Sequence, residues 1–195
     1  RNIMEKMISA RTIDFQPDDE TGIPKVYDGQ KVIIGGMITE KTIKYTRNNK
    51  VMAFLTVEDL MGTVEIVVFP RDYEKWQTLI NEDARVFIQG RVNAEDDKPS
   101  KLILEKVRAF DDIPREIWIQ FKDREDYAQK EQELLNYLRG SVGTSAVVIY
   151  LKDVKAIKRL PAGYHVQISD FLLEELKKKY GDSNVKVVER VLKNF

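Results

Sequence analysis

Hydrophobic and polar residues alternate along most of residues 31–69, and this period of two predicts three successive β-strands. The third strand repeats the pattern of the first after a turn at Met61-Gly62. The apolar positions of these two strands are Val32, Ile34 and Ile38, then Val64, Ile66 and Val68. The glycine pair Gly35-Gly36 removes side chains inside the first strand, where a long strand of a small closed barrel must bend.

The pattern downstream predicts a short helix and two further strands. Residues 70–80 begin with a proline and place aromatic and aliphatic residues at helical spacing. Residues 84–92 and 101–110 alternate as strands, and the turn-like residues 93–100 separate them. Five strands with a helix after the third is the element order of the OB-fold, a barrel that binds oligonucleotides and oligosaccharides. We therefore predict a nucleic-acid-binding OB-fold domain over residues 25–112.

The first 24 residues do not fit the barrel pattern. Residues 1–10 are typical of the end of a helix, and the acidic, proline-containing residues 14–24 are typical of a connector. We expect residues 1–24 to be a helix tail and linker, and the chain to be a fragment of a larger protein.

A second unit is expected over residues 113–195, because two acidic residues and Pro114 mark the end of the last barrel strand. Its predicted strands cover residues 116–121, 146–151, 164–168 and 185–191, and its predicted helices cover residues 123–139 and a segment that Ser169 caps. The order βαββαβ predicts a small α+β domain of the ferredoxin-like, split βαβ type.

The composition excludes several classes of function but does not identify one. The chain has 32 basic and 32 acidic residues, so a nucleic-acid site has to come from local clustering of cations. There is no cysteine and only one histidine, His165, which we interpret as structural; we expect no metal site, no cofactor and no catalytic residue. No apolar run approaches the length of a membrane span, so we expect a cytoplasmic protein without a membrane or small-molecule partner.

Such clustering occurs between the first two predicted strands. A polar Asn48-Asn49 turn joins them, and no acid follows Glu40 before the second strand. The cations and the aromatic residue of this hairpin are Lys41, Lys44, Tyr45, Arg47 and Lys50. We expect the cations to neutralise phosphates.

Several short segments resemble a known family. They are Gly35-Gly36-Met37-Ile38, residues 52–59, Gly62, residues 65–70, Tyr73 and Gly90. In this order they are similar to the OB domain near the C-terminus of the alpha subunit of bacterial DNA polymerase III, and the last unit is similar to that subunit's terminal domain. The resemblance implies contact with single-stranded DNA by the barrel and binding of the clamp-loader tau subunit by the terminal domain. It also implies that a polymerase core, with the catalytic aspartates of a nucleotidyltransferase, lies outside this chain.

The same strand signature is similar, less closely, to anticodon-binding OB domains of class II tRNA synthetases. In those domains a phenylalanine of the second strand stacks on an anticodon base, and Phe54 matches its place. Phe54 is therefore either a platform for a base or a residue that packs under the hairpin. Tyr45 is either a second stacking residue or a cross-strand packing residue. We interpret Phe69 and Trp76 as barrel core.

In the last unit, four residues of the helix after Ser169 are candidates for a protein-docking surface: Leu172, Leu173, Leu176 and Tyr180. We expect them to expose more apolar surface than one small sheet covers, with burial of all four in the core as the alternative. The leading hypothesis is a non-catalytic piece of a replicative polymerase that binds single-stranded DNA and tau. The alternatives are a tRNA anticodon-type module and a purely structural or protein-interaction OB protein.

Overall fold

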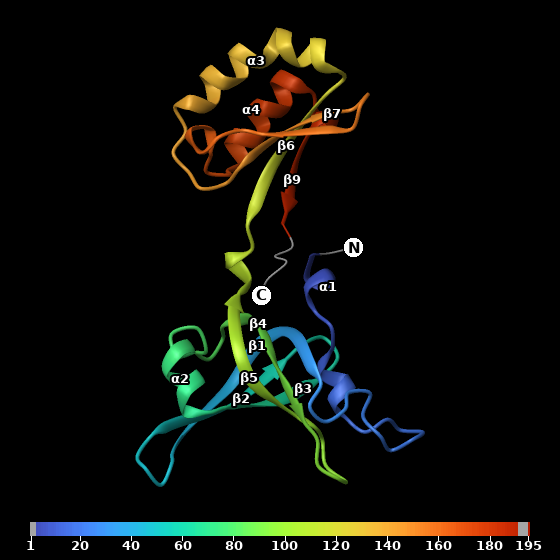
Figure 1. Ribbon diagram of the computed structural model, residues 1–195, viewed down its shortest axis with the longest axis vertical. Helices are drawn as coiled ribbons and strands as arrows, with labels where there is room; N and C mark the ends of the chain where they lie inside the picture. Colours follow the sequence, from blue (N-terminus) through green and yellow to red (C-terminus); the bar gives the residue numbers. More distant parts are fainter. Residues whose placement is uncertain (1–2, 191–194) are drawn as a thin grey trace. The chain divides into compact units, whose positions relative to one another are not determined.

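The computed structural model describes residues 3–190 and residue 195 (Figure 1). The described chain forms two compact units. The first holds the residues up to Ile113 together with Phe195, and the second is Pro114–Arg190. No helix in the described ranges is both long enough and apolar enough to cross a membrane.

The first unit is a closed five-stranded barrel, as the alternation predicted. Its strands are β1 (Lys31–Tyr45), β2 (Val51–Glu58), β3 (Thr63–Val68), β4 (Arg85–Asn93) and β5 (Lys101–Ala109). Hydrogen bonding runs in the order β1-β2-β3-β5-β4 and returns to β1. The neighbours are antiparallel except β3 and β5, which are parallel. The prediction of an OB-type barrel is confirmed.

Strand β1 closes the barrel because it pairs with two different strands. Its first half pairs with β4 and its second half with β2, and the change of partner occurs around Gly36 and Met37. A side chain at Gly36 would overlap the backbone carbonyl of Glu58, so this close approach requires glycine. A bulge follows between Ile38 and Glu40 and bends the strand further.

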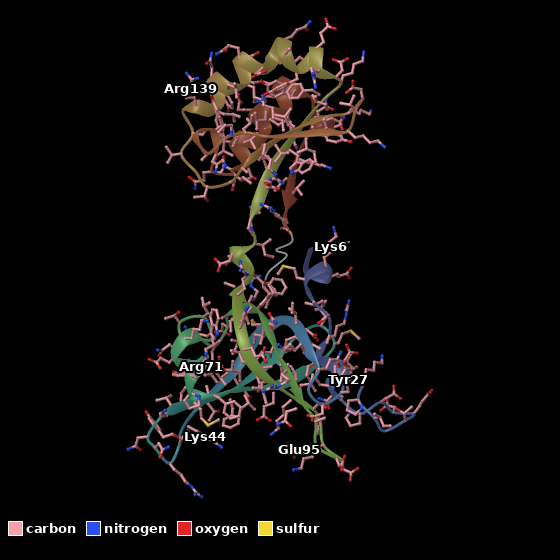
Figure 2. The ribbon with its side chains drawn as sticks, in the orientation of Figure 1. Lys6, Tyr27, Lys44, Arg71, Glu95 and Arg139 are labelled. Carbon is pink, nitrogen blue, oxygen red and sulfur yellow. The ribbon has the colours of Figure 1, made fainter. Side chains whose placement is uncertain are left out.

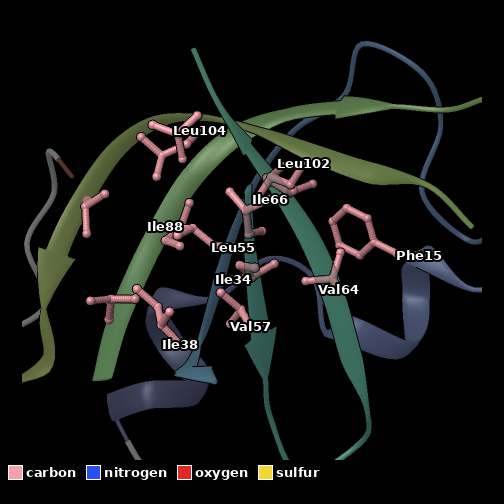
Figure 3. Close-up of a cluster of buried hydrophobic side chains, with 14 of the residues drawn as sticks. Phe15, Ile34, Ile38, Leu55, Val57, Val64, Ile66, Ile88, Leu102 and Leu104 are labelled. Carbon is pink, nitrogen blue, oxygen red and sulfur yellow. The ribbon is translucent and has the colours of Figure 1, made fainter. Parts of the chain in front are cut away.

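The barrel interior is filled by aliphatic side chains that alternate inward from every strand (Figure 3). The residues Ile34, Leu55, Ile66, Ile88 and Leu102 are almost completely buried. Helix α2 (Pro70–Trp76) packs Tyr73 and Trp76 against this core, and the Trp76 indole donates a hydrogen bond to the Glu105 carbonyl at 3.0 Å. Trp76 therefore lies at the edge of the core, as expected.

The segment before the barrel packs on it rather than acting only as a connector. It contains the short helix α1 (Ile3–Met7) and the 3-10 helix η1 (Thr12–Phe15). Phe15 is fully buried in the barrel core, next to Val64 in Figure 3. Thr12 is also buried, and its hydroxyl donates to Asp59 at 2.6 Å. This segment is therefore part of the barrel unit.

The second unit is a four-stranded sheet with two helices. The strands are β6 (Arg115–Phe121), β7 (Val147–Leu151), β8 (Ala156–Arg159) and β9 (Val185–Glu189), and the helices are α3 (Arg124–Arg139) and α4 (Asp170–Tyr180). Short 3-10 helices lie at η2 (Phe110–Asp112), η3 (Ala162–Tyr164) and η4 (Asp182–Asn184). Figure 1 shows both α-helices on one side of the sheet.

Two expectations for this unit were wrong. The third strand is β8, and the predicted strand at residues 164–168 makes only one isolated bridge, Ser145 with Val166, because η3 occupies the chain just before it. The strand order is β8-β7-β6-β9, with β6 and β7 as direct parallel neighbours. A split βαβ unit would hold another strand between these two, so the sheet is not of the ferredoxin-like type.

The expected docking face of α4 also needs correction. Ser169 caps the helix by accepting a hydrogen bond from the Leu172 amide at 3.1 Å, as predicted. However, Leu172, Leu176 and Tyr180 are buried, and Leu173 is half-buried against the same core. Positions four apart share one helix face, and here that face lies on the sheet. The large apolar residue that α4 leaves in solvent is Phe171, which is 71% exposed.

Candidate nucleic-acid interface

The β1–β2 hairpin holds the predicted cations on an ordered turn. The Thr46 amide donates to the Lys50 carbonyl at 2.8 Å, and the Asn49 amide donates to the Thr46 carbonyl at 2.9 Å. Asn49 has a φ of 57°, a left-handed conformation that asparagine tolerates better than most residues. The polar Asn48-Asn49 turn predicted from the sequence is therefore present, and Arg47 and Lys50 are exposed on it.

The outer face of this hairpin brings Lys44 and Phe54 together. Phe54 pairs with Thr42 across the two strands, and its chain neighbours Ala53 and Leu55 both point into the barrel. Phe54 is consequently half-buried outside the core. The Lys44 ammonium lies 4.8 Å from the centroid of the Phe54 ring, and Figure 2 shows Lys44 on the hairpin. A cation and a half-buried aromatic ring are thus combined at one position.

Two of the other predicted residues, Lys41 and Tyr45, lie on the opposite face of the hairpin. Lys41 pairs with Leu55, whose side chain is inside the barrel. The Lys41 ammonium contacts Asn81 at 3.4 Å and lies 5.4 Å from the Tyr73 ring centroid. Tyr45 is 71% exposed on this same face. Lys41, which the sequence grouped with the other hairpin cations, therefore lies on a different face from Lys44.

A pocket of about 390 Å³ lies beside Phe54 on the outer face. Its wall combines strand residues with residues from the N-terminal segment and the β4–β5 connection. The polar members are Gln16, Glu40, Thr42, Thr56, Thr63, Glu65 and Ser100. At its wall the Thr56 hydroxyl donates to Glu40 at 3.4 Å, and Lys101, which does not line the pocket, forms an ion pair with Glu65 at 3.6 Å. Sequence reasoning missed this pocket because its walls come from distant parts of the chain.

A second, larger pocket of about 550 Å³ lies on the α2 side of the hairpin. Its lining residues are Lys50, Val51, Pro70, Arg71, Tyr73, Glu74 and Gln77. Arg71 projects from α2 on this side, as labelled in Figure 2. The two pockets therefore occupy opposite faces of one hairpin.

The charges of the barrel's two long hairpins differ in sign. The β4–β5 connection carries Glu95, Asp96 and Asp97, and Figure 2 shows Glu95 at its tip. Glu95 accepts a hydrogen bond from Lys98 at 3.0 Å, and this contact lowers the pKa of the Glu95 carboxyl. A polyanion is therefore attracted to the β1–β2 hairpin and repelled from the β4–β5 tip.

Two further observations concern Phe69 and the possibility of a metal site. Phe69, expected in the core, is 45% exposed, because the inward positions of β3 are Val64, Ile66 and Val68. Within residues 3–190 there is no group of three or more histidine, aspartate or glutamate side chains placed to hold a metal ion.

Comparison with known proteins agrees with this geometry. Residues 32–109 match a family described as OB-fold nucleic acid binding domain. The DNA polymerase III subunit alpha of Halalkalibacterium halodurans is 30% identical over 167 residues, which cover 80% of this chain and 14% of that protein. The corresponding subunit of Bacillus subtilis is 28% identical over 149 residues, covering 74% of this chain and 13% of that protein.

Among solved structures, the SSB domain of a Synechococcus protein has 16% sequence identity and a TM-score of 0.37, covering 43% of this chain and 97% of that one. In the comparison with the two polymerase subunits, the matched region of this chain spans only 13% to 14% of their length. The first unit is an OB-fold domain, and the chain as a whole is similar to DNA polymerase III alpha subunits.

Proposed function

We propose that the barrel unit binds single-stranded DNA, and that it does so in the cytoplasm as part of a replicative DNA polymerase of the polymerase III alpha type. The observation that carries this proposal is the pairing of Lys44 with Phe54 on the outer face of the β1–β2 hairpin. Surfaces that bind unpaired strands combine aromatic rings, on which bases stack, with cations that follow the phosphates. The family match of the barrel and the polymerase similarity both support nucleic acid as the ligand.

The arrangement favours unpaired over paired DNA. Phe54 offers its ring to one base, and a base inside a duplex has its faces covered by its neighbours. Three exposed cations of the proposed site, Lys44, Arg47 and Lys50, lie on a single hairpin. The acidic tip of the β4–β5 connection disfavours a wide surface for a polyanion. We expect modest affinity, because few phosphates can be neutralised at once.

Titration of labelled oligonucleotides of equal length tests this proposal. Oligo-dT is expected to bind more tightly than blunt duplex DNA, with an affinity that falls as salt rises. Oligo-rU serves as the third probe. Tighter binding of oligo-rU than of oligo-dT would favour the anticodon-type module, and equal or tighter binding of duplex would contradict the proposal. If no oligonucleotide binds at any salt concentration, the result would support the alternative of a structural OB protein.

For the unit Pro114–Arg190 we propose docking of the clamp-loader tau subunit. The polymerase matches cover more of the chain than the barrel unit alone, so they extend into this second unit. It also lacks a cation and exposed aromatic pair comparable to Lys44 and Phe54: its cations Lys158 and Lys179 lie over Tyr127, which is buried, and Tyr137, which packs against the core. Four exposed apolar residues of this unit could meet a partner, and Phe171 and Ile157 are the two largest; the others are Val142 and Val154.

Association of the full chain with the cognate tau subunit tests the second proposal. Phe171→Asp and Ile157→Asp change exposed positions and should preserve the fold, and at least one is expected to weaken tau binding. Phe54→Ala in the barrel is the matched control and should leave tau binding unchanged. If both surface variants bind tau as the wild type does and Phe54→Ala does not, the interface lies on the barrel. If the wild-type chain does not bind tau at all, the proposal is wrong.

A further inference from the structure

The pocket beside Phe54 has the wrong charge for a phosphate. Two of its lining residues, Glu40 and Glu65, are carboxylates, and both are exposed at its wall. One hydroxyl, from Thr56, reaches Glu40, and one cation, Lys101, reaches Glu65. Each carboxylate has two oxygens with several acceptor positions, so both retain capacity to accept further hydrogen bonds. The pocket therefore suits a neutral group that donates hydrogen bonds.

Ser100 is a buried polar residue at the wall of this pocket. It lines the pocket and is only 2% exposed. Its amide donates to the Phe15 carbonyl at 2.9 Å, but its hydroxyl has no hydrogen-bond partner among the described residues. Buried hydroxyls are normally paired, and an unpaired one lowers stability. The hydroxyl oxygen has almost no accessible surface, so a ligand atom in the pocket would reach it only after rotation of the Ser100 side chain.

The size and position of the pocket fit one nucleobase. Its volume of about 390 Å³ is ample for a purine or pyrimidine ring, and Phe54 forms part of its wall. Lys44 is placed over Phe54 but does not line the pocket. A nucleotide bound here would keep its base against Phe54, Glu40 and Glu65, and its phosphate near Lys44.

We infer that this pocket selects bases that carry an exocyclic amino group: cytosine, adenine or guanine over thymine. The inference rests on the proposed binding of single-stranded DNA and deepens it. Carboxylates only accept hydrogen bonds, so they favour an amino donor, and glutamate pairs with the cytosine amino group in DNA complexes. Thymine presents one N–H between two carbonyl oxygens, and these oxygens are repelled by carboxylates. Guanine presents two adjacent donors, which match the two oxygens of one carboxylate.

Oligo-dC and oligo-dT of equal length, compared on the full chain at neutral pH and one salt concentration, test the inference. The two pyrimidines have similar size and differ in an amino or a carbonyl group at the same ring position. We expect oligo-dC to bind about five- to hundredfold more tightly. Glu40→Gln and Glu65→Gln should reduce this ratio, by weakening oligo-dC binding and strengthening oligo-dT binding. Glu82→Gln removes the same charge from an exposed position outside the pocket and should leave the ratio unchanged.

Ser100→Ala is a second, independent variant. Removing an unpaired buried hydroxyl should leave the melting temperature unchanged or slightly raised. A loss of oligo-dC affinity in this variant would therefore come from a change in the pocket and not from a loss of folded protein. Equal binding of the two oligonucleotides would overturn the selectivity while leaving the proposed function intact. The selectivity would also be overturned if both glutamate variants bind both oligonucleotides more tightly by the same factor. In that case the carboxylates would only repel phosphate. Failure of both oligonucleotides to bind would overturn the proposed function together with this inference.

Discussion

The Lys44 ammonium lies 4.8 Å from the centroid of the Phe54 ring, across the antiparallel pair formed by β1 and β2. A cation–π contact at an exposed site is worth about 0.5–1 kcal/mol, too little to decide whether the barrel folds. Its consequence is local, because it holds a positive charge over the Phe54 ring. The first two predictions test the two halves of this pair.

Phe54→Ala should weaken single-stranded DNA binding by about 1–3 kcal/mol, the usual effect of losing a base-stacking ring. The melting temperature should change little, since Phe54 is half-buried outside the barrel core. Fluorescence anisotropy with oligo-dC and thermal unfolding of the same sample measure both quantities. Phe54→Trp keeps a stacking surface and should retain affinity, and Phe171→Ala removes an exposed phenyl group from the second unit as a control. A stability loss of about 3–5 kcal/mol would instead make Phe54 a core residue.

Replacing Lys44, Arg47 and Lys50 together by Ala should reduce the salt dependence of binding. For single strands, each lost phosphate contact lowers the log–log salt slope by about 0.7. Lys41→Ala should change the slope less, because its ammonium faces Asn81 and Tyr73 on the other side of the hairpin.

The matched control removes three cations from the last turn of α4, Lys177, Lys178 and Lys179. This change should leave the slope unchanged if the second unit makes no phosphate contacts. An unaltered slope in the hairpin variant, or an equal loss in the α4 variant, would show that the hairpin is not the phosphate-binding surface.

Asp59 should make the stability of the barrel unit dependent on acidic pH. Partial burial would raise the pKa of the Asp59 carboxyl, but hydrogen bonds from the Thr12 hydroxyl and from the amides of Thr12, Met61 and Gly62 outweigh it, and the net pKa falls below 3.8. A lowered pKa in the folded state stabilises the fold above the unfolded pKa, and this stabilisation is lost as the pH falls through the folded value.

Asp59→Ala should therefore cost about 1.5–3 kcal/mol at pH 7, the usual size for hydrogen bonds to a charged group. The difference from wild type should narrow as the pH falls below about 4. Urea unfolding at pH 7 and pH 3 measures this difference, and Asp19→Ala removes an exposed carboxylate of the N-terminal segment for comparison. A difference that does not change with pH would mean that the charge of Asp59 contributes nothing.

Two buried phenols should limit the stability of the second unit in alkali. Burial, together with the nearby Glu131 and Glu133, raises the pKa of Tyr127 and of Tyr180 to about 12. Neither hydroxyl has a hydrogen-bond partner among the described residues. A raised pKa in the folded state gives a stabilisation that is complete below pH 10 and is lost as the pH rises toward 12.

Tyr127→Phe with Tyr180→Phe should leave stability at pH 7 unchanged or slightly higher, and should reduce the loss between pH 7 and pH 11. Trp118 fluorescence in a Trp76→Phe background reports unfolding of this unit alone. Tyr45→Phe changes an exposed phenol and should have no effect. Equal loss of stability at pH 11 in the wild type and the double variant would rule out these two phenols as the cause.

The apolar face of α4 shows what a helical pattern in the sequence predicts and what it does not. The spacing of Leu172, Leu176 and Tyr180 places them on one face of the helix, and this was visible in the sequence. Whether that face meets solvent or core depends on how much surface the sheet and α3 cover, and a one-dimensional pattern does not contain that area. The structure buries all three residues in one core and exposes Phe171.

The sequence by itself determined the strands of the barrel, the order of its elements and the hairpin that carries Lys44 and Phe54, because alternation, turn residues and cross-strand neighbours are local properties. Tertiary structure decided the rest of the site. Alternation alone separates Lys41 and Tyr45 from Lys44, but the bulge between Ile38 and Glu40 shifts the inward positions of β1 by one residue and so decides that Lys41 and Tyr45 lie on the face that continues the barrel interior. Barrel closure then brings Ser100 beside Phe54, and contacts between residues so far apart in the chain follow from the closed fold and not from any local pattern.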